Sequence, residues 1–285
     1  MAATTAAPAP GARTTVACAQ LALAVGDTAG NLAAAEEAIG AAADAGARVV
    51  VLPELANSGY VFADPAEARA LAEPVDGPTV TAWREAARRH GVTLVAGFAE
   101  LDDDGLVRNS AVLIDPAGTV RAVYRKAHLF GTEKDFFVPG DQAPPVVDVE
   151  GVGRIGVMVC YDVEFPEWVR RTALAGAELL CAPVNWPLFP RPAGERPGEV
   201  VRVQADAAVN RIYVAACDRA GEERGVPWTG GSVIVDPDGF PLAGHTPTEG
   251  PALLLAACDL AAARDKRLGE HNDVFGDRRP ELYGN

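Results

Sequence analysis

The sequence predicts an α/β fold: a four-layer α-β-β-α sandwich with an internal pseudo-two-fold repeat. Apolar strand-like runs alternate with alanine-rich helical stretches, and the strands are continuous apolar runs, typical of strands covered on both faces. The stretch "SAVLIDPAGTVRA" is also similar to "GSVIVDPDGFPLA", with Val112 and Asp115 each matched 121 positions later by Val233 and Asp236. Such a repeat is typical of a pseudo-symmetric fold. The pattern alone leaves a three-layer doubly wound sheet as the alternative.

The first half of the chain supplies one set of strands and helices. Helix 27–46 has Asp27 or Thr28 near its start and Gly46 at its end, and helix 78–91 ends at Gly91. A Pro-Ala-Gly turn divides the apolar stretch 108–126 into two strands. Apolar, often β-branched runs predict the other strands of this half, at 14–23, 47–55 and 92–100.

The second half repeats this order. Its predicted strands and helices are strand 154–162, helix 166–177, strand 178–187, helix 198–210, strand 211–221 and the stretch 230–244. Only the polar segment 265–285 departs from this pattern, so we expect one domain over 13–264. Residues 1–12 are rich in Ala, Pro and Thr and predict a mobile tail. The polar segment 265–285 predicts an extension that either docks on the domain or lies at a subunit interface.

The overall charge excludes some classes of partner. The chain carries 25 Lys and Arg against 39 Asp and Glu, a net charge of −14, whereas nucleic acids and anionic membranes bind basic surfaces. No apolar run is long enough to span a bilayer. Five widely spaced cysteines without a CxxC pair suit reduced core residues, so we expect a cytoplasmic protein. The four histidines show no metal-ligand spacing.

Glu54 follows an apolar strand in "LPELANSGY". An acid is seldom buried without a partner, and pockets form at the carboxyl ends of strands in α/β folds. The alternative is a solvated strand end.

Lys126 and Glu133 lie in the aromatic-rich stretch "YRKAHLFGTEKDFFVPG". Packing of Phe130, Phe136 and Phe137 would bury this loop, and the alternative is a surface loop with a Lys–Glu pair.

Cys160 ends the strand in "VMVCYDVEFPEWVR", where a helix is expected to begin. Such a turn exposes a side chain at the mouth of the sheet, and a helix N-terminus favours a thiolate. Nearby acids oppose ionisation of the thiol. Read alone, Cys160 is either a nucleophile or an inert core residue.

Taken together, Glu54, Lys126 and Cys160 resemble the Glu-Lys-Cys triad of the nitrilase superfamily, the carbon–nitrogen hydrolases. Their contexts are "VLPEL", "YRKAHLF" and "CYDVEFPE", and Glu133 matches a second glutamate often found in the family. The resemblance extends from "VACAQL" to "RRPELY". It implies the four-layer sandwich, a homodimer or higher homo-oligomer, and chemistry that needs no metal or organic cofactor.

The resemblance also implies a mechanism. Glu54 takes the proton from Cys160, whose thiolate attacks an amide carbonyl, and Lys126 with the backbone N–H of Tyr161 stabilises the oxyanion. Ammonia leaves, and Glu54 activates water against the thioester. Glu133 positions these groups or the substrate.

The residues after the nucleophile indicate the branch. Tyr161-Asp162 follows Cys160, where nitrilases of the superfamily have Trp-Glu, and the sequence is similar to aliphatic amidases. This implies hydrolysis of small linear amides, including ω-amino and ω-guanidino amides, and not of peptide bonds. We expect Asn185, Trp186 and Phe189 in "APVNWPLF" to line the pocket, with a core position as the alternative for Trp186.

Other substrates and another function remain open. Asp135, Asp162 and Glu164 are equivalent candidates to bind a cationic tail. An N-carbamoyl amine or amino acid hydrolase would bind a carboxylate through arginine, for which Arg191 and Arg196 are candidates. A nitrilase-like module that binds without catalysis is the alternative of another class, and the complete triad argues against it.

Overall fold

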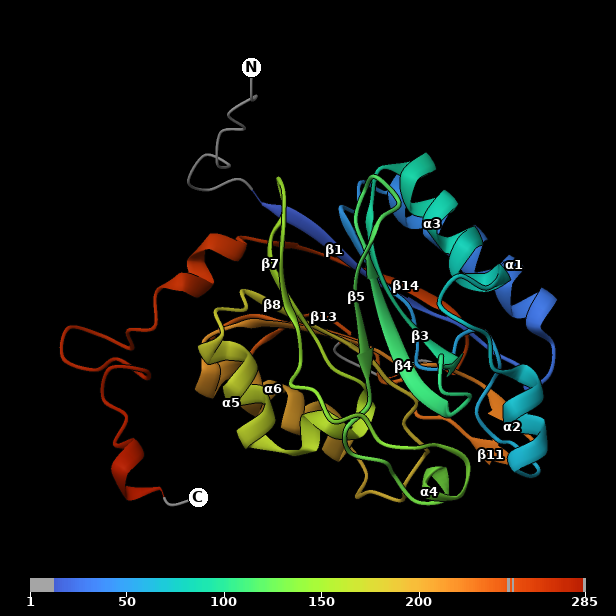
Figure 1. Ribbon diagram of the computed structural model, residues 1–285. Coiled ribbons are helices and arrows are strands. Elements are labelled where there is room, and N and C mark those ends of the chain that lie inside the picture. Colours follow the sequence, from blue (N-terminus) through green and yellow to red (C-terminus); the bar gives the residue numbers. More distant parts are fainter. Residues whose placement is uncertain (1–12, 245–246, 248, 284–285) are drawn as a thin grey trace.

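The computed structural model describes residues 13–244, 247 and 249–283, so the tail expected at 1–12 lies outside the described residues. The chain forms two six-stranded mixed sheets (Figure 1). The strand order of the first sheet is β14-β1-β2-β3-β4-β5. Its strands are β1 (Thr14–Gln20), β2 (Val49–Val51), β3 (Thr93–Leu101), β4 (Val107–Ile114), β5 (Val120–Arg125) and β14 (Ala252–Cys258).

The second sheet has the order β13-β12-β9-β8-β7-β6. Its strands are β6 (Val146–Val149), β7 (Gly153–Val157), β8 (Leu179–Pro183), β9 (Tyr213–Cys217), β12 (Val233–Val235) and β13 (Pro241–Ala243). A short separate hairpin joins β10 (Glu222–Glu223) to β11 (Val226–Pro227).

The two sheets match strand for strand, which confirms the predicted repeat. The parallel series β1-β2-β3 corresponds to β7-β8-β9, and in each sheet the outer strands on both sides pair antiparallel. Asp115 and Asp236 make the same turn, because each carboxylate accepts hydrogen bonds from the backbone N–H groups two and four residues later.

Helices cover the outer face of each sheet (Figure 1). The first sheet carries α1 (Thr28–Asp44) and α3 (Pro78–His90), and the second carries α5 (Pro166–Leu174) and α6 (Gly198–Asn210). Two short helices, α2 (Pro65–Leu71) and α4 (Glu133–Phe136), lie in loops. Val16, Cys18 and Val51 of the first sheet share one buried apolar cluster with strands β7, β8 and β9 of the second. The four-layer sandwich is therefore confirmed, and the doubly wound single sheet is excluded.

Several element boundaries differ from the prediction. The first strand ends at Gln20, because the following residues leave the ladder with β14. The last predicted element ends at residue 244, yet β14 follows and pairs antiparallel with β1 along seven residues. β14 is half-buried over most of its length, as an edge strand should be.

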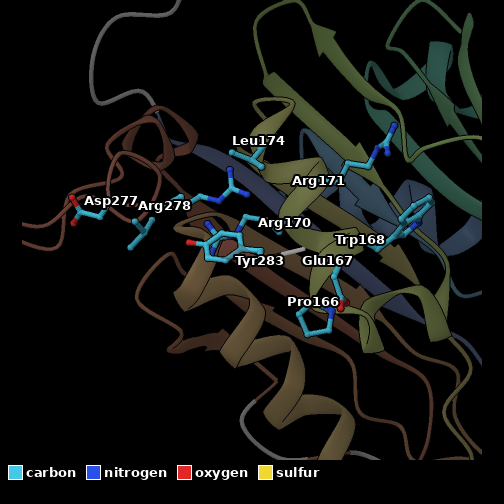
Figure 2. A pocket seen from close by; sticks show the side chains of 10 residues that line it. Pro166, Glu167, Trp168, Arg170, Arg171, Leu174, Asp277, Arg278 and Tyr283 are labelled. Atoms are coloured by element: carbon cyan, nitrogen blue, oxygen red, sulfur yellow. The ribbon is translucent and has the colours of Figure 1, made fainter. Parts of the chain in front are cut away.

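The C-terminal extension lies beside α5. The ring of Phe275 is held between Lys266 and Arg170, whose charged groups are 4.9 and 5.2 Å from its centroid. Between α5 and the extension runs an open groove of about 890 Å³. Figure 2 shows the α5 side chains on this groove together with Arg278 and Tyr283 of the extension.

Candidate active site

Three chemically active side chains follow the carboxyl ends of strands from both sheets. Glu54 comes three residues after β2, and Lys126 comes directly after β5, both in the first sheet. Cys160 comes three residues after β7 in the second sheet. The face-to-face packing of the sheets therefore brings both halves of the chain to one site.

Lys126 lies between two carboxylates, all of them nearly inaccessible to solvent. Its ammonium donates to Oε1 of Glu54 and to Oε1 of Glu133, each at 2.7 Å. Burial alone would lower the pKa of Lys126, but the charges of Glu133 and Glu54 outweigh it and raise that pKa well above its usual value. Lys126 is therefore a fixed positive charge.

Glu54 has the environment of a general base. Burial raises its pKa to about 7, although Lys126 pulls that pKa in the opposite direction. Its Oε1 also accepts from Nδ2 of Asn109 at 2.7 Å. Among the described residues, none donates a hydrogen bond to the other oxygen, Oε2. That oxygen is available to accept a proton.

Cys160 is held in a strained backbone conformation with φ +46°. This left-handed region is costly for any residue with a Cβ, and such strain concentrates at functional sites. Its Sγ donates to the carbonyl oxygen of Asn185 at 3.8 Å. Burial raises the pKa of the thiol well above its usual value, and the charge of Glu54 raises it further.

Cys160 lies in a separate turn between β7 and α5 and not in the first turn of the helix. β7 ends at Val157, Cys160 begins the 3₁₀ turn Cys160–Glu164, and α5 begins only at Pro166. The resting nucleophile is a neutral thiol that a base must deprotonate.

Asp162 organises the turn that carries the nucleophile. Its buried carboxylate accepts from the hydroxyl of Tyr124 at 2.8 Å and from the backbone N–H of Val159 at 3.2 Å. Its Oδ1 accepts from the backbone N–H of His128 and lies 2.7 Å from the Nδ1 of that ring. With these partners Asp162 has a structural role, so it does not serve as the acid for a substrate tail.

The Glu54 segment is clamped from two sides. A Cβ at Gly97 in β3 would lie only 2.5 Å from the Cα of Glu54, so only glycine permits this approach. On the other side, Asn185 Nδ2 donates to the carbonyl oxygen of Glu54 at 2.9 Å. The side-chain amide of Asn185 thus supports the base, while its carbonyl oxygen accepts from the nucleophile.

A cavity of about 140 Å³ opens onto Cys160. Its lining residues are Phe130, Cys160, Tyr161, Glu164, Asn185, Trp186, Pro187, Phe189, Glu199 and Arg202. All three predicted pocket residues are in this set. Trp186 is also nearly fully buried, so pocket and core positions coincide.

Only some of the charged residues considered for binding a substrate tail lie at the cavity. Of the three acids considered for a cationic tail, Glu164 lines the cavity, where it forms an ion pair with Arg202. Asp135 is exposed on α4 and outside the cavity lining. Arg191 and Arg196 are also exposed and outside that lining. Arg202, which sequence reasoning did not select, is the cavity's arginine.

The wall at Trp186 is anchored by Asp218. This buried carboxylate accepts from the backbone N–H groups of Trp186, Arg219 and Gly231 at 2.8–2.9 Å. Burial raises the pKa of Asp218 to about 7 despite these donors.

Sequence reasoning missed other residues around the cluster. The hydroxyl of Tyr60 donates to Oε1 of Glu133 at 2.5 Å. The signal for Tyr60 was its place six residues after Glu54, and that for Asn109 was an amide inside an apolar strand. The anchoring roles of Asp162 and Asp218 gave no comparable signal, because each carboxylate accepts from groups that only folding brings near, such as the hydroxyl of Tyr124 and the backbone N–H of Trp186.

The described residues include neither a metal-ligand cluster nor a membrane-spanning helix. Among them, no three His, Cys, Asp or Glu side chains gather so as to hold a metal ion. None of the helices within the described ranges has the length and apolarity that crossing a bilayer requires.

Comparison with known families agrees with this geometry. The family profile described as "Carbon-nitrogen hydrolase" matches residues 15–268. The chain belongs to the carbon–nitrogen hydrolase family. This hydrolase is 41% identical over 256 residues to a protein of Pyrococcus abyssi named nitrilase, covering 89% of this chain and 92% of the relative. It is 34% identical over 239 residues to 2-oxoglutaramate amidase of Bacillus subtilis, covering 83% and 87%.

Solved structures of an amidase from Nesterenkonia sp. share the fold of this hydrolase. A double mutant in complex with acrylamide is 30% identical, with a TM-score of 0.78 and coverage of 97% of this chain and 98% of that one. A mutant in complex with butyramide is 31% identical, with a TM-score of 0.74 and coverage of 90% and 95%. Together with the family match, these relatives identify the chain as a carbon–nitrogen hydrolase acting on amides.

Proposed function

We propose that this hydrolase is an amidase that converts a small linear aliphatic carboxamide into the carboxylic acid and ammonia through a thioester on Cys160. The observation that carries the proposal is the buried Glu54–Lys126–Glu133 cluster beside a neutral thiol at the base of a small cavity. Amide cleavage requires a general base whose pKa lies near neutrality, a fixed cation and a nucleophile.

The first half-reaction forms the thioester. Glu54 takes the thiol proton while Sγ bonds to the carbonyl carbon, and the electron pair of the C=O bond moves to oxygen. The positive charge of Lys126 and the backbone N–H of Tyr161 stabilise that oxyanion. The oxyanion then collapses, the C–N bond breaks, and the proton from Glu54 passes to the leaving nitrogen, so that ammonia departs.

The second half-reaction releases the acid. Glu54 takes a proton from water, whose oxygen attacks the thioester carbon, and the C–S bond breaks. The proton on Glu54 returns to the sulfur. Glu133, held by Tyr60 and Lys126, keeps the cluster's geometry constant in both halves.

The cavity volume supports short amides. A cavity of about 150 Å³ holds a benzene-sized molecule, which has six heavy atoms, and the cavity at Cys160 is about 140 Å³. Butyramide also has six heavy atoms, and the Nesterenkonia amidase has been captured with butyramide and acrylamide.

We further propose that the substrate ends in an amino or guanidino group, and that Glu164 would bind this cation. Glu164 and Glu199 both contact Arg202, so two carboxylates and one guanidinium lie around this cavity. The surplus negative charge favours a cation over an anion. Comparison of 4-aminobutanamide with pentanamide, its apolar counterpart of equal length, tests this: the cation should be hydrolysed with the lower KM.

The carbamoyl alternative has less support. A carbamoyl amino acid would present a carboxylate, and Arg191 and Arg196 lie outside the cavity while Arg202 is already paired with two acids. A binding module without catalysis would not need a buried base whose pKa is about 7.

One panel distinguishes these functions. Short carboxamides, N-carbamoyl amines and nitriles are incubated with the protein, and ammonia and carbon dioxide are measured, with Cys160→Ala as the blank. Ammonia from amides alone supports the proposal, and carbon dioxide in equal amount indicates the carbamoyl reaction. The binding module would give no product from any of the three classes.

We also propose a cytoplasmic homo-oligomer, with residues 265–285 at a subunit interface. Large apolar side chains are exposed on α5 and on the extension, at Leu174, Leu268, Leu282 and Tyr283. Light scattering should find a dimer or larger assembly for the full chain and a smaller species for a chain ending at Arg264. A monomeric full chain would refute this proposal.

A further inference from the structure

A second cavity lies next to the one that opens onto Cys160. Its volume is about 310 Å³. Its lining residues are Tyr60, Val61, Phe62, Phe130, Gly131, Thr132, Phe136, Pro187, Val226 and Trp228. None of these ten described residues carries a charge, and five have aromatic rings.

The two cavities share part of their walls. Phe130 and Pro187 line both cavities, so the two cavities are neighbours. The second cavity also borders the catalytic cluster, because the hydroxyl of its lining residue Tyr60 donates to Glu133. Phe130 and Pro187 therefore form a boundary that the second cavity shares with the space at Cys160.

We propose that the second cavity is an acyl-chain subsite that takes the neutral, apolar tail of amides longer than butanamide. This inference rests on the proposed amidase function and extends it, because the cavity at Cys160 has room for about six heavy atoms. Carbons beyond those leave that cavity, and the adjoining apolar walls bury them.

The linings of the two cavities select different tails. Glu164, Glu199 and Arg202 border the first cavity, whereas uncharged and mostly aromatic or aliphatic side chains line the second. A charged group in the second cavity would lose its hydration without gaining a charged partner. The subsite therefore discriminates by polarity as well as by length.

A chain-length series tests the subsite in the wild-type enzyme. Burying one methylene favours binding by a factor of about four, so kcat/KM should rise about fourfold per carbon from butanamide to heptanamide. The chain-matched cation 6-aminohexanamide should lack this gain. A flat or falling kcat/KM beyond butanamide, or equal gains for the cation, would overturn the proposal.

Variants that fill the second cavity test whether the chain-length dependence of kcat/KM arises there. Val226→Phe, and independently Val61→Phe on another segment, should lower the heptanamide-to-butanamide ratio of kcat/KM toward one. Val138→Phe makes the same change at an exposed position outside both linings, and the wild-type ratio should persist there. Wild-type ratios in both filled variants would overturn the assignment.

The failure of this proposal differs from failure of the proposed function. A wild-type enzyme that hydrolyses acetamide and butanamide without a chain-length gain refutes the subsite alone. An enzyme that hydrolyses none of the amides refutes the amidase function itself.

Discussion

The ammonium of Lys126 lies 2.7 Å from Oε1 of Glu54, and both side chains are excluded from solvent. Two charges so close in a region of low polarity affect each other strongly. Burial nevertheless has the larger effect on Glu54 and raises its pKa to about 7. The carboxylate that abstracts the proton therefore titrates near neutrality, where a general base is most effective.

We expect kcat/KM to follow the ionisation of Glu54. The base is active only when ionised, so kcat/KM should rise with pH through about 7 and level off above it. The pH profile with butanamide measures this. Glu54→Gln, which cannot accept the proton, should lose on the order of 10²–10⁴-fold in rate and the rise with pH. A wild-type rate that falls between pH 6 and 8 would contradict the assignment of Glu54 as base.

Replacement of the nucleophile should separate catalysis from backbone strain. Cys160→Ala should abolish turnover and keep the fold, since the methyl group retains the Cβ. Cys160→Gly should also be inactive, but relief of φ +46° should make it about 1 kcal/mol more stable than Cys160→Ala. Urea unfolding of the two variants measures the difference. If the alanine variant is the more stable, the strain at Cys160 is not real.

Gly97→Ala should displace the base. The added Cβ would lie 2.5 Å from the Cα of Glu54, and backbone cannot yield as a flexible side chain does. We expect a loss of at least tenfold in kcat and of about 1–3 kcal/mol in stability. Gly40→Ala on α1 is the matched control, because its Cβ meets only the ring of His90 at 3.5 Å. The control should keep full activity and gain up to about 1 kcal/mol.

Stability should decrease as the solution approaches neutral pH. Burial raises the pKa values of Glu54, Asp206 and Asp218 to about 7, whereas in the unfolded chain such groups titrate near pH 4. Between these values the folded state holds more protons than the unfolded state. The free energy of unfolding should therefore fall as pH rises from about 4 to 7 and level off above. Glu67 and Asp265, whose pKa values arginine partners lower in the folded state, oppose this trend only near pH 4 and are ionised in both states above about pH 5.

Asp218→Asn tests this linkage at one site. Removal of the titrating carboxyl should make the free energy of unfolding decrease less steeply with pH, by at most about 1.4 kcal/mol per pH unit. The variant should also be less active, because Asp218 fixes the backbone of Trp186 in the cavity wall. Urea unfolding at pH 5, 6, 7 and 8 measures the slope. An unchanged slope would show that Asp218 does not titrate in this range.

The position of the site could be read from the sequence because its chemistry follows strand ends. Glu54, Lys126 and Cys160 each come within three residues of a strand's end, and the sandwich brings those ends together. The 121-residue repeat predicted the architecture because β4 and β12 occupy equivalent positions in the two sheets, β4 between β3 and β5 and β12 between β9 and β13.

Long-range contacts could not be read in this way. β14 was not anticipated, because its apolar run gains meaning only from pairing with β1, more than two hundred residues away in the chain. Tyr60 and Asp162 act through partners that only folding brings near, at Glu133 and Tyr124. The sequence left the ionisation of Cys160 open, because the local turn and the nearby acids act on the thiol in opposite directions. Burial, which only the folded structure reveals, raises the pKa of the thiol.

The division of the site between two sheets makes enzymatic activity an assay for folding. Glu54 and Lys126 belong to one half of the chain and Cys160 to the other, so neither half alone contains a complete catalytic set. Turnover during refolding should appear only when the sheets dock, later than the recovery of secondary structure. Two fragments divided between β5 and β6 should be inert apart, and regained turnover on mixing would report their reassembly.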